Sequence, residues 1–304
     1  MLFPEGRISA VQRRFMTTTG ADNVANIALK GSFDDCQAIV KEMFQDKTLR
    51  QAVDLSGVNS INWARIAAQA VYYFTSAVSL GAPYRDVSFV VPTGNFGDAF
   101  AGFAAQRMGL PIERIIVATN SNDIVARAIE TGRYARGPVA QTQSPAMDIQ
   151  VSSNFERLYF EAVEREGLET SRAMRAFAES GVIEIPPKAL GSIRELFVGV
   201  GVSEAETAKT MVSTFHESGE LIDPHTAVAV AAASRIGSKR RQTPLVVLST
   251  AHPAKFPEAV RAAAGVDVTL PNSVRGLVEK PERIDHLPAD LATIKAYVRD
   301  FAGA

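Results

Sequence analysis

The chain has 304 residues, 46% of them hydrophobic, and a formal net charge of −1. This length predicts one large or two ordinary domains with a substantial core. The near-neutral charge excludes a global field that would favour nucleic acid or anionic lipid. The densest basic run, Lys239-Arg240-Arg241, is typical of a solvated loop between elements.

Residues that form disulfides, metal sites and membrane spans are sparse. The one cysteine, Cys36, cannot form an internal disulfide, which fits a reducing compartment. The four histidines do not pair at metal-ligand spacing. No apolar stretch reaches the ~18 residues that span a bilayer, and the N-terminus has no signal-peptide core. We therefore expect a cytoplasmic protein that binds no metal, membrane or nucleic acid and exists as a monomer or homodimer.

Helix and strand patterns alternate along the first part of the chain. Residues 9–18 predict a helix with Ser9 as N-cap, residues 23–29 a strand, and residues 32–44 a helix with one apolar face. Residues 62–79 are rich in alanine and aromatic side chains, and we expect a buried helix there.

The middle of the chain carries the strongest strand signals. Residues 86–91 predict a strand buried on both faces, followed by a helix over 97–108 and the next strand over 114–118. This order implies a right-handed crossover in a parallel sheet. Residues 154–219 are expected to form a mainly helical insertion.

A last helix-strand-helix pattern follows. Asp223 and Pro224 mark a helix start, as N-cap and first helical residue. Residues 244–250 predict a last buried strand and residues 257–264 a short helix. The whole pattern favours a doubly wound α/β chain, in which ligands bind beyond the carboxyl ends of the strands.

The stretch VVPTGNFGDAF, residues 90–100, joins a buried strand to a helix through two glycines. Glycine lets backbone N–H groups close on a ligand, and the helix dipole favours an anion there. The pattern is neither a dinucleotide fingerprint nor a Walker loop, so a small phosphate ester is the better candidate. An ordinary glycine-bearing turn remains the alternative, and Asp98 must point its carboxylate away from any phosphate.

Two further strand-end or helix-start segments carry polar side chains. In VNSINWARI, the residues Asn59, Ser60 and Asn62 precede a helix on which Arg65 follows, so the segment predicts a second anion site. Ordinary N-capping with a surface arginine is the alternative. In STAHPAKF, hydroxyls including Thr250 stand where a strand ends, either to cap the chain or to bond a heteroaromatic ring.

Together these segments resemble threonine synthase of the microbial and fungal type. VNSINWARI, VPTGNFGDAFAGF and STAHPAKF occur in the family's order and spacing, and FDDCQAIVK and SPAMDIQVSSNFERLYFEA strengthen the match. The resemblance covers essentially the whole chain. It implies the pyridoxal-phosphate (PLP) fold of the tryptophan-synthase β type, fold type II, with parallel sheets flanked by helices. It also implies conversion of O-phospho-L-homoserine and water to L-threonine and phosphate, the last step of threonine biosynthesis.

The resemblance also implies roles for particular residues. Those expected to cradle the phosphate of PLP are Gly94, Asn95, Phe96 and Gly97. Thr250 matches the hydroxyl residue that faces the pyridine nitrogen of the cofactor. Those expected to hold the phosphate of O-phospho-L-homoserine are Asn59, Ser60 and Arg65. The implied domains are residues 1–55 of a smaller mobile α/β domain, 56–265 of a large PLP-binding domain, and a C-terminal tail with a helix at 266–304.

Two motifs of the family are not found in this sequence. The lysine that forms an imine with PLP and a Ser-Gly-Asp-Thr-Gly loop both precede the family position that matches Met1. We therefore expect the C-terminal two-thirds of the enzyme, with its N-terminal part missing and little activity as an isolated chain. A non-catalytic phosphate-binding remnant is one alternative. Another PLP lyase such as threonine dehydratase is a second, disfavoured because its substrate carries no phosphate for NSINWAR to bind.

Overall fold

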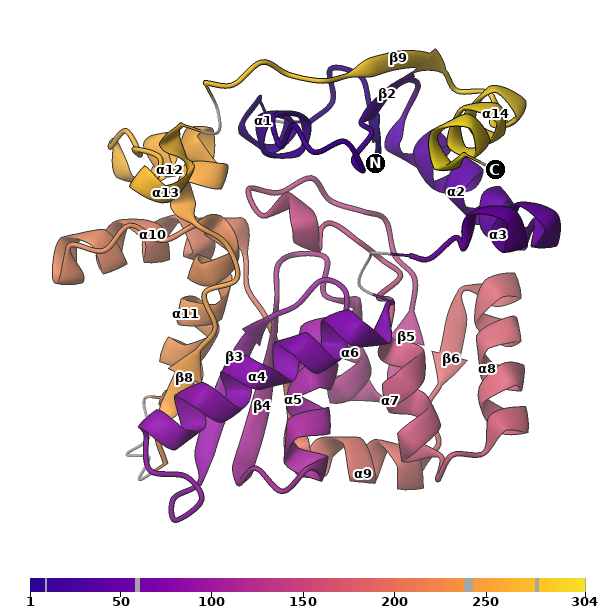
Figure 1. Cartoon of the computed structure of the whole chain (residues 1–304). Helices are drawn as coiled ribbons and strands as arrows, with labels where there is room; N and C mark the ends of the chain where they lie inside the picture. The colour runs from indigo at the N-terminus through magenta and orange to yellow at the C-terminus, as the bar shows by residue number, and fades with distance from the viewer. Residues whose placement is uncertain (9, 58–60, 238–242, 277–278, 304) are drawn as a thin grey trace. The chain divides into compact units, whose positions relative to one another are not determined.

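The computed structural model describes residues 1–8, 10–57, 61–237, 243–276 and 279–303. They fall into two compact units (Figure 1). Unit 1 comprises Met1–Gly57 and Thr269–Ala304, and unit 2 comprises Val58–Val268. Across the described ranges, no helix combines the length and apolar character needed to cross a membrane. The basic run at 239–241 lies outside the described residues.

Unit 1 is built on a three-stranded parallel sheet in the order β1-β2-β9. Its strands are β1 (Leu2–Pro4), β2 (Ile27–Lys30) and β9 (Asp285–Pro288). Its helices are α1 (Ala10–Thr17), α2 (Phe33–Gln45), α3 (Lys47–Val53), α13 (Asn272–Arg275) and α14 (Leu291–Ala302). The C-terminal segment predicted as a tail therefore supplies both a strand and a helix to this unit.

Helix α2 begins where the sequence predicts. The Ser32 hydroxyl accepts the N–H of Asp35 at 3.2 Å, and the Asp35 carboxylate accepts the N–H of Ser32 at 2.7 Å. This reciprocal capping box satisfies two amides that the helix start would otherwise leave unpaired. Cys36, Ile39 and Met43 then recur at helical spacing and are buried in the core of unit 1.

Unit 2 is built on a four-stranded parallel sheet in the order β7-β4-β3-β8. Its strands are β7 (Phe197–Gly201), β4 (Ile112–Thr119), β3 (Val87–Pro92) and β8 (Leu245–Val247). Every residue of β3 is buried, as its unbroken apolar run predicts. Successive side chains point to opposite faces, so Phe89 and Val91 enter one core cluster and Val90 enters another.

Helices cover both faces of this sheet (Figure 1). Helix α11 (Pro224–Gly237) packs on the face that carries Val90, while α5 (Gly97–Arg107), α6 (Ile124–Thr131) and α9 (Pro187–Leu196) pack on the other. Helix α4 (Trp63–Ser79) lies against α5. The remaining elements are β5 (Arg133–Ala135), the 3₁₀ turns η1 (Pro145–Met147) and η2 (Pro253–Lys255), α7 (Phe155–Ala162), α8 (Gly167–Ser180), β6 (Val182–Glu184), α10 (Glu204–Ser218) and α12 (Pro257–Ala264).

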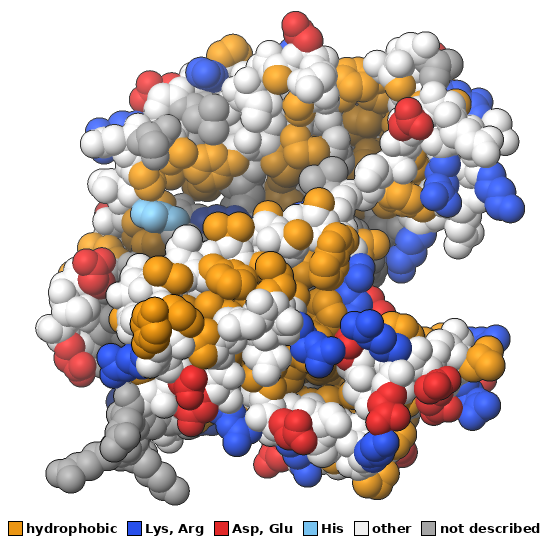
Figure 2. Space-filling model, turned by 60° about the horizontal axis from the view of Figure 1, so that its bottom comes forward, with side chains coloured by type: hydrophobic (Ala, Val, Ile, Leu, Met, Phe, Trp, Pro, Cys, Tyr) orange, Lys and Arg blue, Asp and Glu red, His pale blue; other side chains and the backbone are white. Residues whose placement is uncertain are grey.

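The structure corrects the prediction that the helix over 62–79 is buried. Only one stripe of α4 enters the core, whereas Val71 and Val78 are 60% and 59% exposed. Hydrophobic side chains gather across the middle of the face drawn in Figure 2. The prediction rested on the composition of residues 62–79. Their helical period places some of the apolar residues on the solvent-facing side of α4.

One strand prediction needs correction, and two short strands were not predicted. The last strand, β8, is half-buried rather than buried, because its one partner among the described strands is β3 and it therefore forms an edge of the sheet. The predicted helical insertion over 154–219 does contain helices, but β6 and β7 lie within it. Strand β7 alternates valine with glycine, and glycine is depleted in strands.

Candidate functional site

The glycine-containing loop after β3 is held rigidly by the segment before α7. Ser152 donates its hydroxyl to the carbonyl of Gly94 at 2.6 Å, and the N–H of Ser153 donates to the side-chain oxygen of Asn95 at 3.2 Å. The N–H of Phe96 donates to the carbonyl of Ser153 at 2.8 Å, and the Phe96 ring is fully buried. The loop is therefore shaped before any ligand arrives.

The same loop presents unused backbone donors at the start of an eleven-residue helix. Among the described residues, the N–H groups of Gly94, Asn95, Gly97 and Asp98 donate to no protein group. Such amides carry the positive end of the helix dipole, so this loop can bind an anion. The amide of Phe96 is already engaged, and this residue contributes through its buried ring and the loop shape that it fixes.

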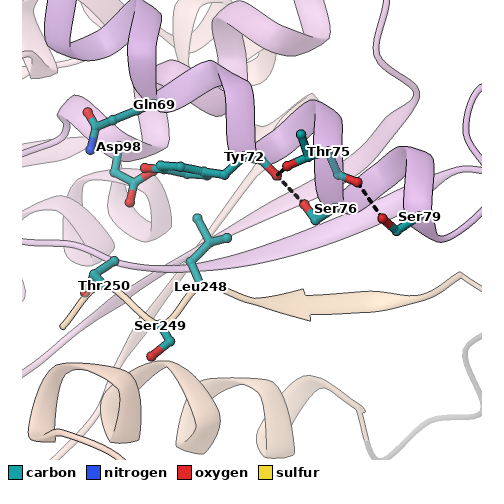
Figure 3. Close-up of a pocket in the computed structure, with 9 residues that line it drawn as sticks. All are labelled: Gln69, Tyr72, Thr75, Ser76, Ser79, Asp98, Leu248, Ser249 and Thr250. Atoms are coloured by element: carbon teal, nitrogen blue, oxygen red, sulfur yellow. Dashed lines mark hydrogen bonds between the residues drawn. The ribbon is translucent and has the colours of Figure 1, made fainter. Parts of the chain in front are cut away.

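A cavity of about 540 Å³ adjoins this loop within unit 2. The start of α5 and the segment after β8 both line this cavity. Asp98 lies on one side, and Ser249 and Thr250 lie on another (Figure 3). Polar residues of α4, from Gln69 to Ser79, form a further wall. Of the predicted loop GNFGD, the cavity is lined by Asp98 alone.

Two tyrosines of α4 bind the Asp98 carboxylate. The hydroxyls of Tyr72 and Tyr73 donate to the same Asp98 oxygen at 2.6 and 3.0 Å, and Tyr73 also reaches the Asp98 carbonyl at 2.9 Å. Burial raises the pKa of Asp98, and the two phenolic hydrogen bonds offset this only in part. The carboxylate thus engages α4, as expected for a group that must leave the anion-binding amides clear.

Replacing Asp98 by asparagine is expected to flatten the pH dependence of stability. Because the pKa of Asp98 in the folded state lies above the unfolded value of 3.8, the folded state holds the proton more tightly. The free energy of unfolding therefore falls as the pH rises from about 4 through the folded pKa, by at most about 1.4 kcal/mol per pH unit. Asparagine accepts the same two hydrogen bonds without titrating.

Urea unfolding from pH 4 to 8 measures this slope. Asp86→Asn, an exposed residue just before β3, is the matched control and should retain the wild-type slope. A slope in Asp98→Asn equal to that of the wild type would contradict the assignment.

The second predicted segment is described in part. Asn62 caps α4 by accepting the N–H of Ala64 at 2.9 Å, in agreement with the capping alternative for this residue. Arg65 is exposed on α4, one turn before Gln69 and two turns before Tyr72, so it shares their face. Asn59 and Ser60 lie outside the described residues.

Sequence reasoning missed one buried polar cluster at the start of α11. Asp223 was predicted as its N-cap and does accept the N–H of His225 at 2.9 Å. The sequence did not indicate that the His225 ring also reaches the backbone of Ala146, 79 residues earlier in the chain. The local signal for this cluster is a histidine two residues after a capping aspartate. No pattern in the sequence indicates Ala146 as the partner of that histidine.

Known proteins resemble this chain along its length. A family model described as "Threonine synthase, C-terminal" matches residues 226–298. The threonine synthase of Pseudomonas aeruginosa is 48% identical over 299 residues, which cover 98% of this chain and 64% of that protein. The crystal structure of PLP-bound threonine synthase from Brucella melitensis is 51% identical, with a TM-score of 0.94, and covers 100% of this chain and 65% of that one.

A third match has a lower sequence identity. The crystal structure of yeast threonine synthase is 36% identical, with a TM-score of 0.89, and covers 99% of this chain and 64% of that one. The predicted fold class, α/β with parallel sheets of the PLP-dependent type, is thus confirmed. The chain spans about 64% of the length of the P. aeruginosa and yeast proteins.

Proposed function

Because the chain is a homologue of threonine synthases over 98% of its length, we propose that it contributes the phosphate-binding part of a PLP site in such an enzyme. The reaction is conversion of O-phospho-L-homoserine and water to L-threonine and phosphate. The observation that carries the proposal is the loop Gly94–Gly97, whose unused amides lie at the end of β3 beside a cavity that Thr250 also lines. We propose a cytoplasmic location for this biosynthetic step.

The donors of this loop suit the phosphate group of PLP. Gly94, Asn95 and Gly97 offer backbone N–H groups, and Phe96 fixes the loop through its buried ring and its bond to Ser153. Thr250 lines the adjoining cavity, and its hydroxyl is the neutral partner proposed for the ring nitrogen. When bound, PLP supplies an electron sink for carbanion chemistry. The residues of this chain hold and orient it.

The second phosphate, that of the substrate, is proposed to bind at the start of α4. Asn59, Ser60 and Arg65 remain the candidates. Arg65 supports this proposal because it is exposed on the helical face that carries Gln69 and Tyr72 into the cavity. A guanidinium can grip a phosphate through two parallel hydrogen bonds. Asn62 fixes where the helix begins and hence where Arg65 projects.

The 304-residue chain is expected to bind PLP saturably and without covalent attachment. Nine of the described residues line the cavity, and lysine is not among these nine. Lys255, the nearest candidate in sequence, is exposed, with its ammonium 5.8 Å from the centre of the Phe256 ring. Absorbance titration with PLP, competed by inorganic phosphate, tests binding. Borohydride reduction followed by mass spectrometry tests attachment.

Each outcome of these measurements has a distinct meaning. Absence of saturable PLP binding contradicts the proposed site, and reduction onto a lysine contradicts non-covalent binding. Steady release of threonine and phosphate from O-phospho-L-homoserine would overturn the expectation that the isolated chain has little activity. Binding without turnover agrees with the proposal.

A further inference from the structure

A buried pair, Asp223 and His225, lies at the start of α11 in unit 2. Their side chains are 0% and 5% exposed. The ring nitrogen Nδ1 of His225 lies 2.7 Å from an Asp223 carboxylate oxygen, which also accepts the backbone N–H of His225. The other carboxylate oxygen accepts the N–H and the hydroxyl of Thr226. The carboxylate is thus fully engaged by the first turn of the helix.

The second ring nitrogen of His225 decides which tautomer is present. Nε2 accepts the backbone N–H of Ala146 at 3.2 Å, so Nε2 carries no proton and Nδ1 donates to Asp223. Burial opposes the ionisation of Asp223, but the hydrogen bonds from His225 and Thr226 outweigh it and lower the pKa of Asp223. An ionised acceptor at Nδ1 therefore keeps Nε2 available as an acceptor for Ala146.

The backbone that His225 holds is the backbone on which the anion-binding loop rests. A side-chain carbon added at Gly94 would lie 2.7 Å from the carbonyl oxygen of Ala146 and 2.9 Å from the Cα of Met147. The two backbones are therefore in direct contact. The far end of this segment is held separately, because Asp148 accepts hydrogen bonds from Asn120 and Asn122.

The same cluster also extends to the wall of the cavity. The hydroxyl of Thr226 lies 3.2 Å from the hydroxyl of Ser249, which lines the cavity next to Thr250. One connected set of hydrogen bonds therefore runs from the end of β8, through the start of α11, to the segment beneath Gly94. The Asp223 side chain is sufficient to cap α11. Capping therefore does not explain why the His225 ring is placed between Asp223 and Ala146.

We propose that the Asp223–His225 pair positions the anion-binding loop, by fixing the tautomer that holds Ala146 and Met147 against Gly94. This rests on the proposed function only in taking the phosphate of PLP as the anion. His225 is a positioning residue, since Ala146 separates it from the loop. Its removal leaves the hydrogen bonds of the loop to Ser152 and Ser153 in place, but the backbone of Ala146 that packs against Gly94 loses its acceptor.

A matched pair of variants tests this role in the 304-residue chain. Glutamine at 225 can place its carbonyl oxygen where Nε2 stands and so keep the acceptor for Ala146. Asparagine can place its amide N–H near Nδ1 and bond Asp223, but leaves Ala146 without an acceptor. We expect His225→Asn to weaken PLP binding about tenfold and His225→Gln to stay within about threefold, since an unsatisfied polar group is the costlier loss.

Thermal unfolding of both variants separates positioning from general destabilisation. The proposal is supported if the two variants lose similar stability while only His225→Gln retains PLP affinity. The proposal would be overturned if both variants lost PLP affinity equally and in proportion to their loss of stability. That result would mean that His225 contributes only to the packing of the core.

Nuclear magnetic resonance gives a test that does not depend on PLP. In the ligand-free wild type, the nitrogen shifts of His225 should report a proton on Nδ1 and none on Nε2. The amide signals of Gly94 and Asn95 should shift in His225→Asn and remain near the wild-type positions in His225→Gln. Unchanged signals in His225→Asn would overturn the positioning role, whereas failure of the wild type to bind PLP would contradict only the proposed function.

Discussion

Replacing Gly94 by alanine is expected to weaken PLP binding at least tenfold and to lower the free energy of unfolding by about 1–3 kcal/mol. The added carbon would lie 2.7 Å from the Ala146 carbonyl oxygen and 2.9 Å from the Met147 Cα. Both are backbone atoms, so neither can rotate away, and the loop or the segment beneath it must move. PLP titration and urea unfolding measure the two effects.

Gly191→Ala is the matched control in the same unit. Gly191 lies inside α9, and no heavy atom lies within 4 Å of a carbon added there. Alanine in a helix interior should stabilise the chain by about 0.5–1 kcal/mol and leave PLP affinity unchanged. A Gly94→Ala variant that binds PLP as tightly as this control would refute the tight contact between the loop and Ala146.

Replacing Gly199 by alanine is expected to cost about 3 kcal/mol of stability. Gly199 lies in β7, where helix α6 crosses the strand so closely that an added carbon would lie 2.5 Å from the Ala126 carbonyl oxygen and 2.7 Å from its Cα. The strand is paired with β4, with Gly199 opposite Val117, which limits its retreat. Urea unfolding followed by circular dichroism measures the loss.

Gly201→Ala supplies the control on the same strand. The nearest atom to a carbon added there is the Cβ of Asp123 at 3.5 Å, an ordinary van der Waals distance. Its effect should stay within about 0.5 kcal/mol. Similar losses in the two variants would mean that the cost arises from changing glycine in a strand and not from the approach of α6.

Local patterns predicted the elements that carry the loop. Strand β3 is an unbroken apolar run, and the glycines after it mark the turn into α5, so the position of this turn could be predicted from the sequence. Asp223 was predicted as an N-cap on the same grounds, and capping was the alternative for the segment that contains Asn62. Both side chains accept an amide of the turn that follows. These signals act within a few residues of the chain, which is why they can be recognised.

Contacts between distant segments could not be predicted in this way. Tyr72 and Tyr73 bind Asp98 across about 25 residues, and His225 binds Ala146 across 79. Each depends on how helices pack on the sheet, which no short window of sequence records. Strand β7 was missed for a related reason. Its glycines weaken the strand pattern, yet they are what allows α6 to approach.

The strand order β7-β4-β3-β8 has a consequence for where this site lies. From β3 the chain proceeds to β4 and then to β7 on one side, and it returns to β8 on the other side of β3. The connections that leave β3 and β8 therefore diverge, and a crevice opens between them at this topological switch point. In sequence, GNFG follows β3 and Thr250 follows β8. The location proposed for the site thus follows from the connectivity, and the loop residues determine what would bind there.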